Sequence, residues 1–466
     1  MTRAPRRVRK DLPFQRIALV LSGGGGLGAY EVGAFRAFEQ ARLRPRIVLG
    51  VSVGAINALI WVAHDFVSER LRGVWLKLRP ASVGMRWATL GARSIGAFLV
   101  MLAVFEALLT LADVPELRLG RWVSVSGLST ALEWPDLLVD GLAWAAVAFL
   151  GAALLRYSDS IEDLLARLTP PADPQRLNRI TGAVVLALAI LYPVSFLFPF
   201  AWPHRFHLVF VAFTAGAWLL GSSVGGGMGR RLLLRTLPET GGRGLWRSAA
   251  RRRLLDGLLP RSSDHLPLDS GTHLILSACE VESGRLHYFV NWKVGHGRFR
   301  DLVRDALGDV VEMHSRHELL QAALASSAVP VLFEPVRIHK LHYVDGGVFS
   351  NQPLHAVLAD DADALLLVLV SPSESPPRLA QDPLVIDVAA RLSQIANWRD
   401  LQTELRGLPP DWSRDGDPAR VCVVEPESGL PGSLLTFDPE ITKELLSRGE
   451  ADAWSALESA GWLEPA

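Results

Sequence analysis

The sequence is poor in cysteine and carries no net charge. Its 466 residues include only two cysteines, Cys279 and Cys422, and 48 basic residues balance 48 acidic ones. Two distant cysteines without a CxxC pair or a Cys/His cluster exclude a disulfide framework and a typical zinc site. Balanced charge gives no support for nucleic-acid binding. We therefore expect two reduced thiols, no metal, no cofactor and no nucleic-acid partner.

Apolar residues are what the chain has in excess. Mean hydropathy is +0.23 although 21% of the residues are charged, a combination that is unusual for a soluble enzyme. This length can hold two or three domains. The apolar run 17–21 near the N-terminus is too short for the core of a signal peptide, so we expect no cleaved targeting segment.

The most informative pattern is the pentapeptide Gly50-Val51-Ser52-Val53-Gly54. A strand-like run, 47–49, precedes it, and helix-forming residues 55–59 follow. This context predicts a nucleophile elbow, a sharp strand-to-helix turn in which the two glycines let the strand and the helix approach closely. The Ser52 hydroxyl would then lie at a helix N-terminus, where free N–H groups favour a developing oxyanion.

A glycine loop lies upstream of this elbow, between the strand-like run 16–21 and the helix-like run 29–35. Consecutive backbone N–H groups in such a loop can bind a phosphate or stabilise the oxyanion of an acyl transfer. The loop consists of Ser22, Gly23, Gly24, Gly25, Gly26, Leu27 and Gly28.

Nucleotide binding is the competing interpretation of the loop, because Gly23, Gly25 and Gly28 fit GxGxxG. A dinucleotide fold needs an acidic residue where the second strand ends, and this chain has Ser52 there. A Walker loop needs Lys and Ser/Thr after the last glycine, and this chain has Ala-Tyr. A purely structural turn is the other alternative, and the oxyanion role is favoured over both.

A third pattern, Asp345-Gly346-Gly347, follows the strand-like run 341–344. Asp and Gly are ordinary turn residues, so this pattern alone is weak. The glycine loop, the GxSxG serine and the Asp-Gly-Gly aspartate in this order resemble the patatin-like phospholipases. The resemblance covers residues 17–79 and 274–371, about a third of the chain. It is supported by the strand-like run 274–281 with Glu-Ser-Gly after it, by Ala-Ser-Ser-Ala-Val-Pro at 325–330 and by Phe-Glu-Pro at 333–335.

The resemblance implies an acyl hydrolase in which Ser52 is the nucleophile and Asp345 is its partner in a Ser-Asp dyad. A carboxylate can accept the serine proton if burial raises its pKa, and water then hydrolyses the acyl-enzyme. The oxyanion donors would be Gly23, Gly24, Gly25 and Val53.

Two features leave alternatives open. The family usually carries Arg or Lys where this chain has Leu27, which bears on anion binding in the loop. His355 follows Asp345 in the order Ser, Asp, His of an α/β-hydrolase triad, and His339 and His342 are also near in sequence. We expect these histidines to lie outside the reaction and favour the dyad.

Four long apolar segments separate Ser52 from Asp345. Each approaches the roughly 20 residues needed to cross a bilayer, and Glu106, Asp140 and His207 are their only charged or histidine residues. Any one of them could be a buried helix, above all the fourth, which ends in a Gly/Ser-rich run, but this is not expected of all four together. Residues 183–198 of the third lack the polar stripe of packed soluble helices. The segments are Ser94–Ala112, Leu137–Leu155, Ile180–Trp202 and Phe206–Met228.

The two halves of the site can meet only if an even number of spans separates them. Basic residues are abundant before the first motif, in the second loop and after the fourth span, whereas the first loop holds only Arg118 and Arg121. The positive-inside rule therefore predicts an integral protein of the cytoplasmic membrane with its catalytic domain facing the cytoplasm. The intramembrane acids are expected to be structural or interfacial.

We predict a patatin-like three-layer α/β/α sandwich with a mostly parallel sheet, interrupted by an α-helical transmembrane insertion. The C-terminal part has helix-like runs 385–397 and 439–460 and a strand-like run 420–424, whose role is not readable. The expected divisions are a basic tail 1–13, catalytic residues 14–86, an insertion 87–229 with about four helices, a basic linker 230–264, catalytic residues 265–371 and an α/β extension 372–466.

The expected function is hydrolysis of acyl esters in membrane lipids, of phospholipase A or lysophospholipase type, in lipid catabolism or remodelling. The partners would be the bilayer and a phospholipid or other acyl-ester lipid. A catalytically silent membrane protein that binds lipid for sensing or scaffolding is the alternative. A transporter fits less well, because the spans have few polar groups. The lipid class, the ester position and the oligomeric state are left open.

Overall fold

The computed structural model describes residues 7–86 and 244–464, with gaps at 262–265, 269–270, 296, 307 and 375–384, and scattered residues between 89 and 160. The chain divides into two compact units, one formed by Met1–Met85 with Trp246–Ala466 and the other by Arg86–Leu245. The predicted spans 180–202 and 206–228 lie outside the described residues, and the first two spans lie only partly inside. No helix within the described residues is long and apolar enough to cross a bilayer.

A single mixed sheet forms the centre of the first unit. Its strand order is β5-β4-β3-β2-β1-β8-β9, with β7 paired to β3 and β6 paired to β7. The five strands from β3 to β9 are parallel, and β4 and β7 run antiparallel to β3. The predicted mostly parallel sheet is confirmed. The strands are β1 (Ile17–Leu21), β2 (Ile47–Val51), β3 (His273–Glu280), β4 (Leu286–Val290), β5 (Gly308–Glu312), β6 (Val336–Ile338), β7 (Leu341–Asp345), β8 (Ala364–Val368) and β9 (Val421–Val424).

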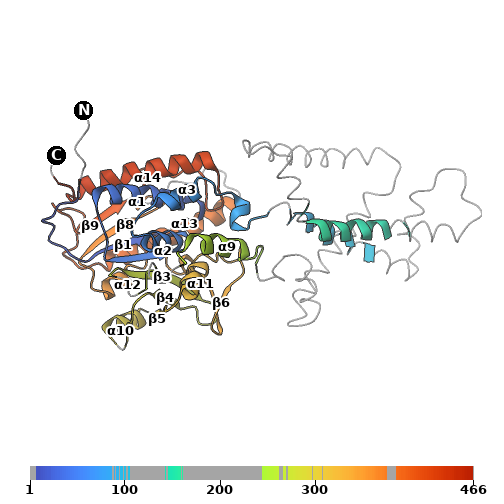
Figure 1. The fold of residues 1–466 in the computed structure, drawn as a ribbon, viewed down its shortest axis with the longest axis horizontal. Helices are drawn as coiled ribbons and strands as arrows, with labels where there is room; N and C mark the ends of the chain where they lie inside the picture. The colour runs from blue at the N-terminus through green and yellow to red at the C-terminus, as the bar shows by residue number, and fades with distance from the viewer. Residues whose placement is uncertain are drawn as a thin grey trace, which may run out of the picture. The chain divides into compact units, whose positions relative to one another are not determined.

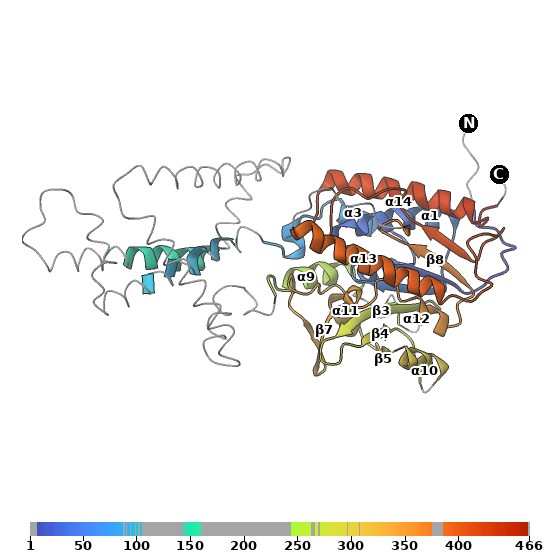
Figure 2. The same cartoon turned by 180° about the vertical axis from the view of Figure 1, so that it is seen from behind.

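Helices cover both faces of this sheet (Figure 1 and Figure 2). Alternate residues such as Val20, Leu49 and Leu367 form one core with α10, α12 and α13, the last of which lies in front in Figure 2. Helices α14, α1, α2 and α11 contact one another in that series and form the third layer. The helices are α1 (Ala29–Ala41), α2 (Val53–Ala63), α3 (Glu69–Trp75), α9 (Ala249–Leu258), α10 (Arg298–Asp305), α11 (Arg316–Ser326), α12 (Leu354–Ala359), α13 (Val385–Arg406) and α14 (Pro439–Ser459), with short 3-10 turns η1 (Gly25–Gly28), η2 (Pro80–Val83) and η7 (Gly346–Val348).

The C-terminal segment belongs to the same unit as the rest of the sheet. Strand β9 extends the sheet beside β8, and α14 packs along α1 (Figure 1). Two glycines allow this close approach, because a Cβ on Gly449 would lie 1.9 Å from the Tyr30 carbonyl oxygen and one on Gly33 would lie 2.2 Å from that of Leu446. The segment whose role could not be predicted therefore completes the sheet and its helical cover.

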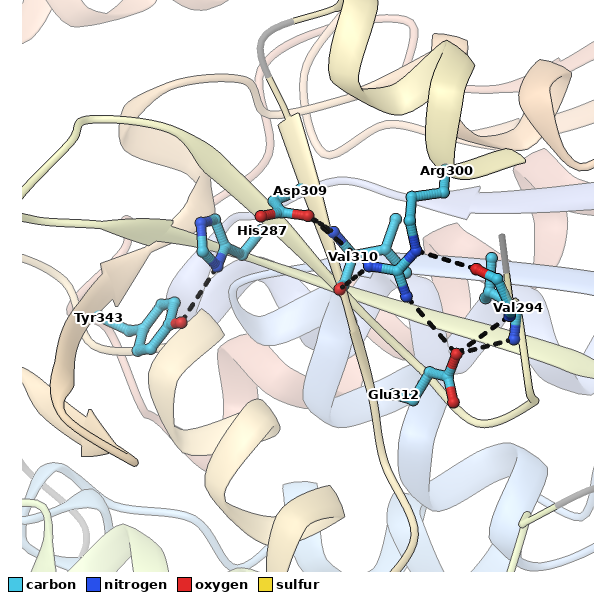
Figure 3. A network of polar contacts seen from close by, with 8 residues as sticks. His287, Val294, Arg300, Asp309, Val310, Glu312 and Tyr343 are labelled. Carbon is cyan, nitrogen blue, oxygen red and sulfur yellow. Dashed lines mark hydrogen bonds and ion pairs between the residues drawn. The ribbon is translucent and has the colours of Figure 1, made fainter. Parts of the chain in front are cut away.

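An ionic network closes the β5 edge of the sheet (Figure 3). Arg300 of α10 lies 3.5 Å from the Glu312 carboxylate and 3.9 Å from that of Asp309, both on β5. The Glu312 carboxylate also accepts a hydrogen bond from the Val294 N–H at 3.0 Å. These contacts tie α10 and the loop after β4 to the edge strand.

Two helical stretches are described within the second unit, between residues 89 and 104 and between 142 and 160. They cross at a pair of glycines, since a Cβ on Gly96 or Gly151 would lie 2.7 Å from the carbonyl oxygen of the other. Arg93 Nε donates to Ser158 Oγ at 2.8 Å near the same crossing. Large apolar side chains of these stretches are exposed, and they include Ile95, Val104, Leu142, Phe149 and Leu150.

Candidate active site

Ser52 and Asp345 lie in direct contact. The Ser52 hydroxyl donates a hydrogen bond of 2.5 Å to Asp345 Oδ2. Ser52 caps the N-terminus of α2 with φ 56° and ψ −122°, a backbone conformation that L-residues rarely adopt. Asp345 ends β7, where it pairs with Ala278 of β3. Only 5% of Ser52 and 4% of Asp345 is exposed, so this contact is shielded from water.

The two glycines of the elbow make its geometry possible. A Cβ on Gly50 would lie 2.4 Å from the Gly54 carbonyl oxygen, and a Cβ on Gly54 would lie 2.7 Å from the Leu21 carbonyl oxygen. Real Cβ atoms do not come so close to backbone atoms, because the overlap is strongly repulsive. Strand β2 and helix α2 can therefore meet at Ser52 only with glycine on both sides of it.

The environment of Asp345 sets the basicity of its carboxylate. Burial raises its pKa to about 6, although hydrogen bonds from Ser52 and the Gly347 N–H, and the positive charge of Arg251, act in the opposite direction. The Gly347 N–H donates to Asp345 Oδ1 at 2.8 Å and holds the carboxylate in place. A carboxylate with this pKa is ionised at neutral pH and is basic enough to accept a proton from a nucleophile.

The glycine loop lies next to the nucleophile, because a Cβ on Gly23 would lie 2.9 Å from Ser52 Cβ. The expectation for Gly23 as an oxyanion donor needs correction, since its N–H already donates to Asn351 Oδ1 at 2.8 Å. The N–H groups of Gly24, Gly25 and Val53 have no acceptor among the described residues. These three groups are the donors that a developing oxyanion could use.

The remaining motif glycines lie at close contacts around this loop and around Asp345. An added Cβ would lie 2.1 Å from the Thr436 carbonyl oxygen at Gly26, 2.7 Å from the Val53 side chain at Gly28, 2.7 Å from the Ser277 carbonyl oxygen at Gly346 and 2.9 Å from Asn351 Oδ1 at Gly347. Leu27, which stands where the family usually has a basic residue, is half-buried within η1.

Two neighbours of the dyad were not predicted. Asn351 holds Gly23 from both sides, because its amide also donates to the Gly23 carbonyl at 3.2 Å. Its own N–H donates to the Asp400 carboxylate of α13 at 3.1 Å. Arg251 of α9 is 4% exposed and is close enough for its charge to act on Asp345. An Asn four residues after an Asp-Gly-Gly turn, or an Arg in a basic segment, has no local sequence pattern that marks it as part of a site.

A buried polar network lies beneath the glycine loop. Asn57 of α2 donates to the Gly28 carbonyl at 2.9 Å and to Glu31 Oε2 at 2.8 Å. The Trp75 indole N–H donates to Asn57 Oδ1 at 3.1 Å. Glu31 is fully buried, and this burial raises its pKa well above the usual range. The network therefore joins the end of the loop to the nucleophile helix through a carboxylic acid that resists ionisation.

Replacing Glu31 with glutamine should reduce the loss of stability at high pH. Because the pKa of Glu31 is higher in the folded state, the folded chain binds more protons than the unfolded chain above the unfolded pKa, and the unfolding free energy falls as pH rises. The slope for one proton is at most about 1.4 kcal/mol per pH unit. Thermal unfolding from pH 5 to 8 should show a flatter profile for Glu31→Gln than for wild type. The exposed control Glu69→Gln should follow wild type, and parallel profiles for all three proteins would contradict the prediction.

The histidines proposed for a triad lie elsewhere. His355 contacts the Tyr288 hydroxyl at 2.8 Å and the Glu404 carboxylate at 3.1 Å. His342 pairs with Glu282 at 2.7 Å. His339 is exposed at a turn. None of these three bonds to Ser52 or Asp345, so the triad alternative is wrong. His287 likewise bonds to Tyr343 (Figure 3). Across residues 7–86 and 244–464 with their gaps, no cluster of His, Cys, Asp or Glu could hold a metal ion.

Comparison with known proteins identifies a family for this chain and two structures that align with it. The model of the family described as patatin-like phospholipase matches residues 19–358. The crystal structure of VipD from Legionella pneumophila aligns with 16% identity and a TM-score of 0.34 over 99% of this chain and 71% of that one. The type III effector protein ExoU aligns with 15% identity and a TM-score of 0.27 over 96% of this chain and 54% of that one. No curated protein sequence gives a significant match.

Proposed function

This chain belongs to the patatin-like phospholipase family, and on that premise we propose that it is a membrane-bound serine hydrolase of acyl lipids. Family membership indicates lipid acyl hydrolase activity. The assignment of Ser52 as nucleophile and Asp345 as base rests on the buried 2.5 Å hydrogen bond from the Ser52 hydroxyl to Asp345. A nucleophile and a base within hydrogen-bond reach are the minimum that covalent ester hydrolysis needs.

In the proposed reaction Asp345 accepts the Ser52 proton as Ser52 Oγ attacks the ester carbonyl carbon. The negative charge that develops on the carbonyl oxygen is stabilised by the N–H groups of Gly24, Gly25 and Val53. The carbon–oxygen bond to the lipid alcohol then breaks, and the alcohol leaves with the proton held by Asp345. Water, deprotonated by Asp345, attacks the acyl carbon. The bond from that carbon to Ser52 Oγ then breaks, Asp345 returns the proton to Ser52 Oγ, and the fatty acid leaves.

Exposed apolar side chains beside the dyad support a lipid substrate. Val348 and Phe349 follow the Asp-Gly-Gly turn directly and are 60% and 47% exposed. Leu434, which is 51% exposed, lies over the glycine loop. Its backbone carbonyl accepts a hydrogen bond from the Gly26 N–H at 2.8 Å. Apolar groups grouped around a polar reaction centre suit an acyl chain with an ester at one end. The structure leaves the head group and the ester position open.

The second unit supports the membrane part of the proposal. Its described helices meet through glycines and a polar pair, while Phe149 and Leu142 are 77% and 69% exposed. Small residues between helices and large apolar residues outside are typical of helices packed in lipid. We therefore propose an integral protein of the cytoplasmic membrane with its catalytic unit on the cytoplasmic side, where basic flanking residues belong.

The proposal is tested with full-length protein in detergent, treated with a fluorophosphonate probe that traps activated serines. Wild type should be labelled on Ser52, and it should release fatty acid from phospholipid or lysophospholipid in mixed micelles. The Ser52→Ala variant should lose both the label and the hydrolysis. Folded wild type that is neither labelled nor active would instead favour a silent lipid-binding protein, and an active, unlabelled Ser52→Ala variant would refute the assignment of the nucleophile.

A further inference from the structure

Arg251 is a buried cation close to the proposed dyad. It lies on α9, the first helix after the chain returns from residues 86–245, and only 4% of it is exposed. Burial lowers its pKa to about 9, so the guanidinium remains charged at neutral pH. A buried charge is costly unless its surroundings compensate it. Arg251 is therefore expected to have a role that its neighbours reveal.

Those neighbours hold the guanidinium from three directions. One terminal nitrogen donates to the Ser327 carbonyl and, at 2.9 Å, to Ser327 Oγ. The other donates to Ser248 Oγ at 2.9 Å. The guanidinium carbon lies 3.7 Å from the centre of the Phe333 ring, a cation–π contact. The charged groups that face it are Asp345 on β7 and Glu334 in the loop before β6.

The segment that Arg251 binds is the one that carries the dyad. Helix α9 packs against α11 (Figure 1), and Ser327 is the C-terminal cap of α11. The residue before it, Ser326, accepts the Ser52 N–H on its hydroxyl at 2.9 Å. The residue after it, Ala328, accepts the Asp345 N–H on its carbonyl at 3.0 Å. Three consecutive residues thus hold both members of the dyad and the cation.

We propose that Arg251 is a positioning residue, which fixes segment 326–328 and thereby sets the distance and orientation between Ser52 and Asp345. A cation at the end of α11 is favoured, because the last carbonyls of a helix carry partial negative charge. The planar guanidinium can bind Ser327 and Ser248 together, which a lysine ammonium on a flexible stem does less well. This inference rests on the proposed function, since it assumes that the dyad performs the reaction.

The positive charge of Arg251 also acts on Asp345, the proposed base. The positive field of Arg251 favours the ionised form of Asp345, against the effect of burial. The other groups that act on Asp345 are the Ser52 hydroxyl and the Gly347 N–H, and both are neutral. Loss of Arg251 should therefore move the acidic limb of the activity profile to higher pH, an effect that a loss of packing or of hydrogen bonds without a loss of charge would not have.

The test compares full-length wild type, Arg251→Gln, Arg251→Lys and the control Arg253→Gln, which replaces an exposed arginine on the same helix. The readouts are kcat and KM for a water-soluble short-chain ester, and kcat/KM from pH 4 to 9. Arg251→Gln should lower kcat about 100-fold, the loss typical of misplaced reacting groups, with little change in KM and with its acidic limb shifted upward. Arg251→Lys should restore the position of the limb and recover only part of kcat.

The outcomes separate this inference from the proposed function. A folded Arg251→Gln variant with the kcat and the acidic limb of the Arg253→Gln control would overturn the positioning role. If Arg251→Gln does not fold, Arg251→Lys tests the positioning role instead. Wild-type kcat in Arg251→Lys would show that the paired hydrogen bonds of the guanidinium to Ser327 and Ser248 are dispensable, and would overturn the inference. Wild type that hydrolyses no ester would overturn the proposed function instead.

Discussion

Replacing Asp345 with asparagine should lower kcat/KM for ester hydrolysis by about 10²- to 10⁴-fold, the range expected for loss of a general base. Asparagine has the shape of aspartate and can still accept the Gly347 N–H, so the turn is retained. It cannot take the Ser52 proton that Asp345 Oδ2 now receives across 2.5 Å. The measurement is steady-state hydrolysis of a soluble ester and of micellar phospholipid.

The hydrolysis rate should decrease at low pH. Because burial raises the pKa of Asp345 to about 6, and because the ionised carboxylate is the active form, wild-type kcat/KM should fall as pH drops through about 6. The residual activity of Asp345→Asn should lack this limb. His355→Gln serves as the control, since His355 bonds to Tyr288 and Glu404 and should keep both the rate and the limb. Undiminished activity in Asp345→Asn, or a comparable loss in His355→Gln, would refute the dyad.

Gly54→Ala should cost both stability and activity. The new Cβ would lie 2.7 Å from the Leu21 carbonyl oxygen, at the end of the central strand β1, and 2.8 Å from that of Ser22, and these backbone atoms cannot move aside cheaply. Overpacking of this kind costs about 1–3 kcal/mol. Any shift of α2 also moves Ser52 away from Asp345. Thermal unfolding and hydrolysis of a soluble ester measure the two effects.

Gly73→Ala provides the matched control for this substitution. Gly73 lies in α3, and nothing would come within 4 Å of an added Cβ there. The alanine should leave activity unchanged and should raise stability by about 0.4–1 kcal/mol, because it restricts the unfolded chain without strain. Equal unfolding temperatures for the two variants would show that the elbow tolerates a side chain, contrary to the steric argument.

Local physics made the elbow predictable from sequence. A serine between two glycines, with a strand before it and a helix after it, has few other conformations, and the close contacts of Gly50 and Gly54 are the reason. Some of the parallel strands were also readable, because strands buried on both faces, such as β1 and β2, are apolar throughout. The transmembrane spans stay a prediction, since they lie wholly or partly outside the described residues.

The sequence by itself determined the elbow and individual strands such as β1 and β2, because each depends on residues close together in the chain. The order of three short motifs indicated the proposed dyad through the resemblance to the family. Tertiary structure decided what surrounds the dyad. Asn351 Oδ1 accepts the Gly23 N–H across 328 residues, His355 contacts Glu404 rather than the dyad, and Arg251 donates to Ser327 across 76 residues. Such contacts arise only when distant segments pack together, and no local pattern encodes which polar side chain meets which.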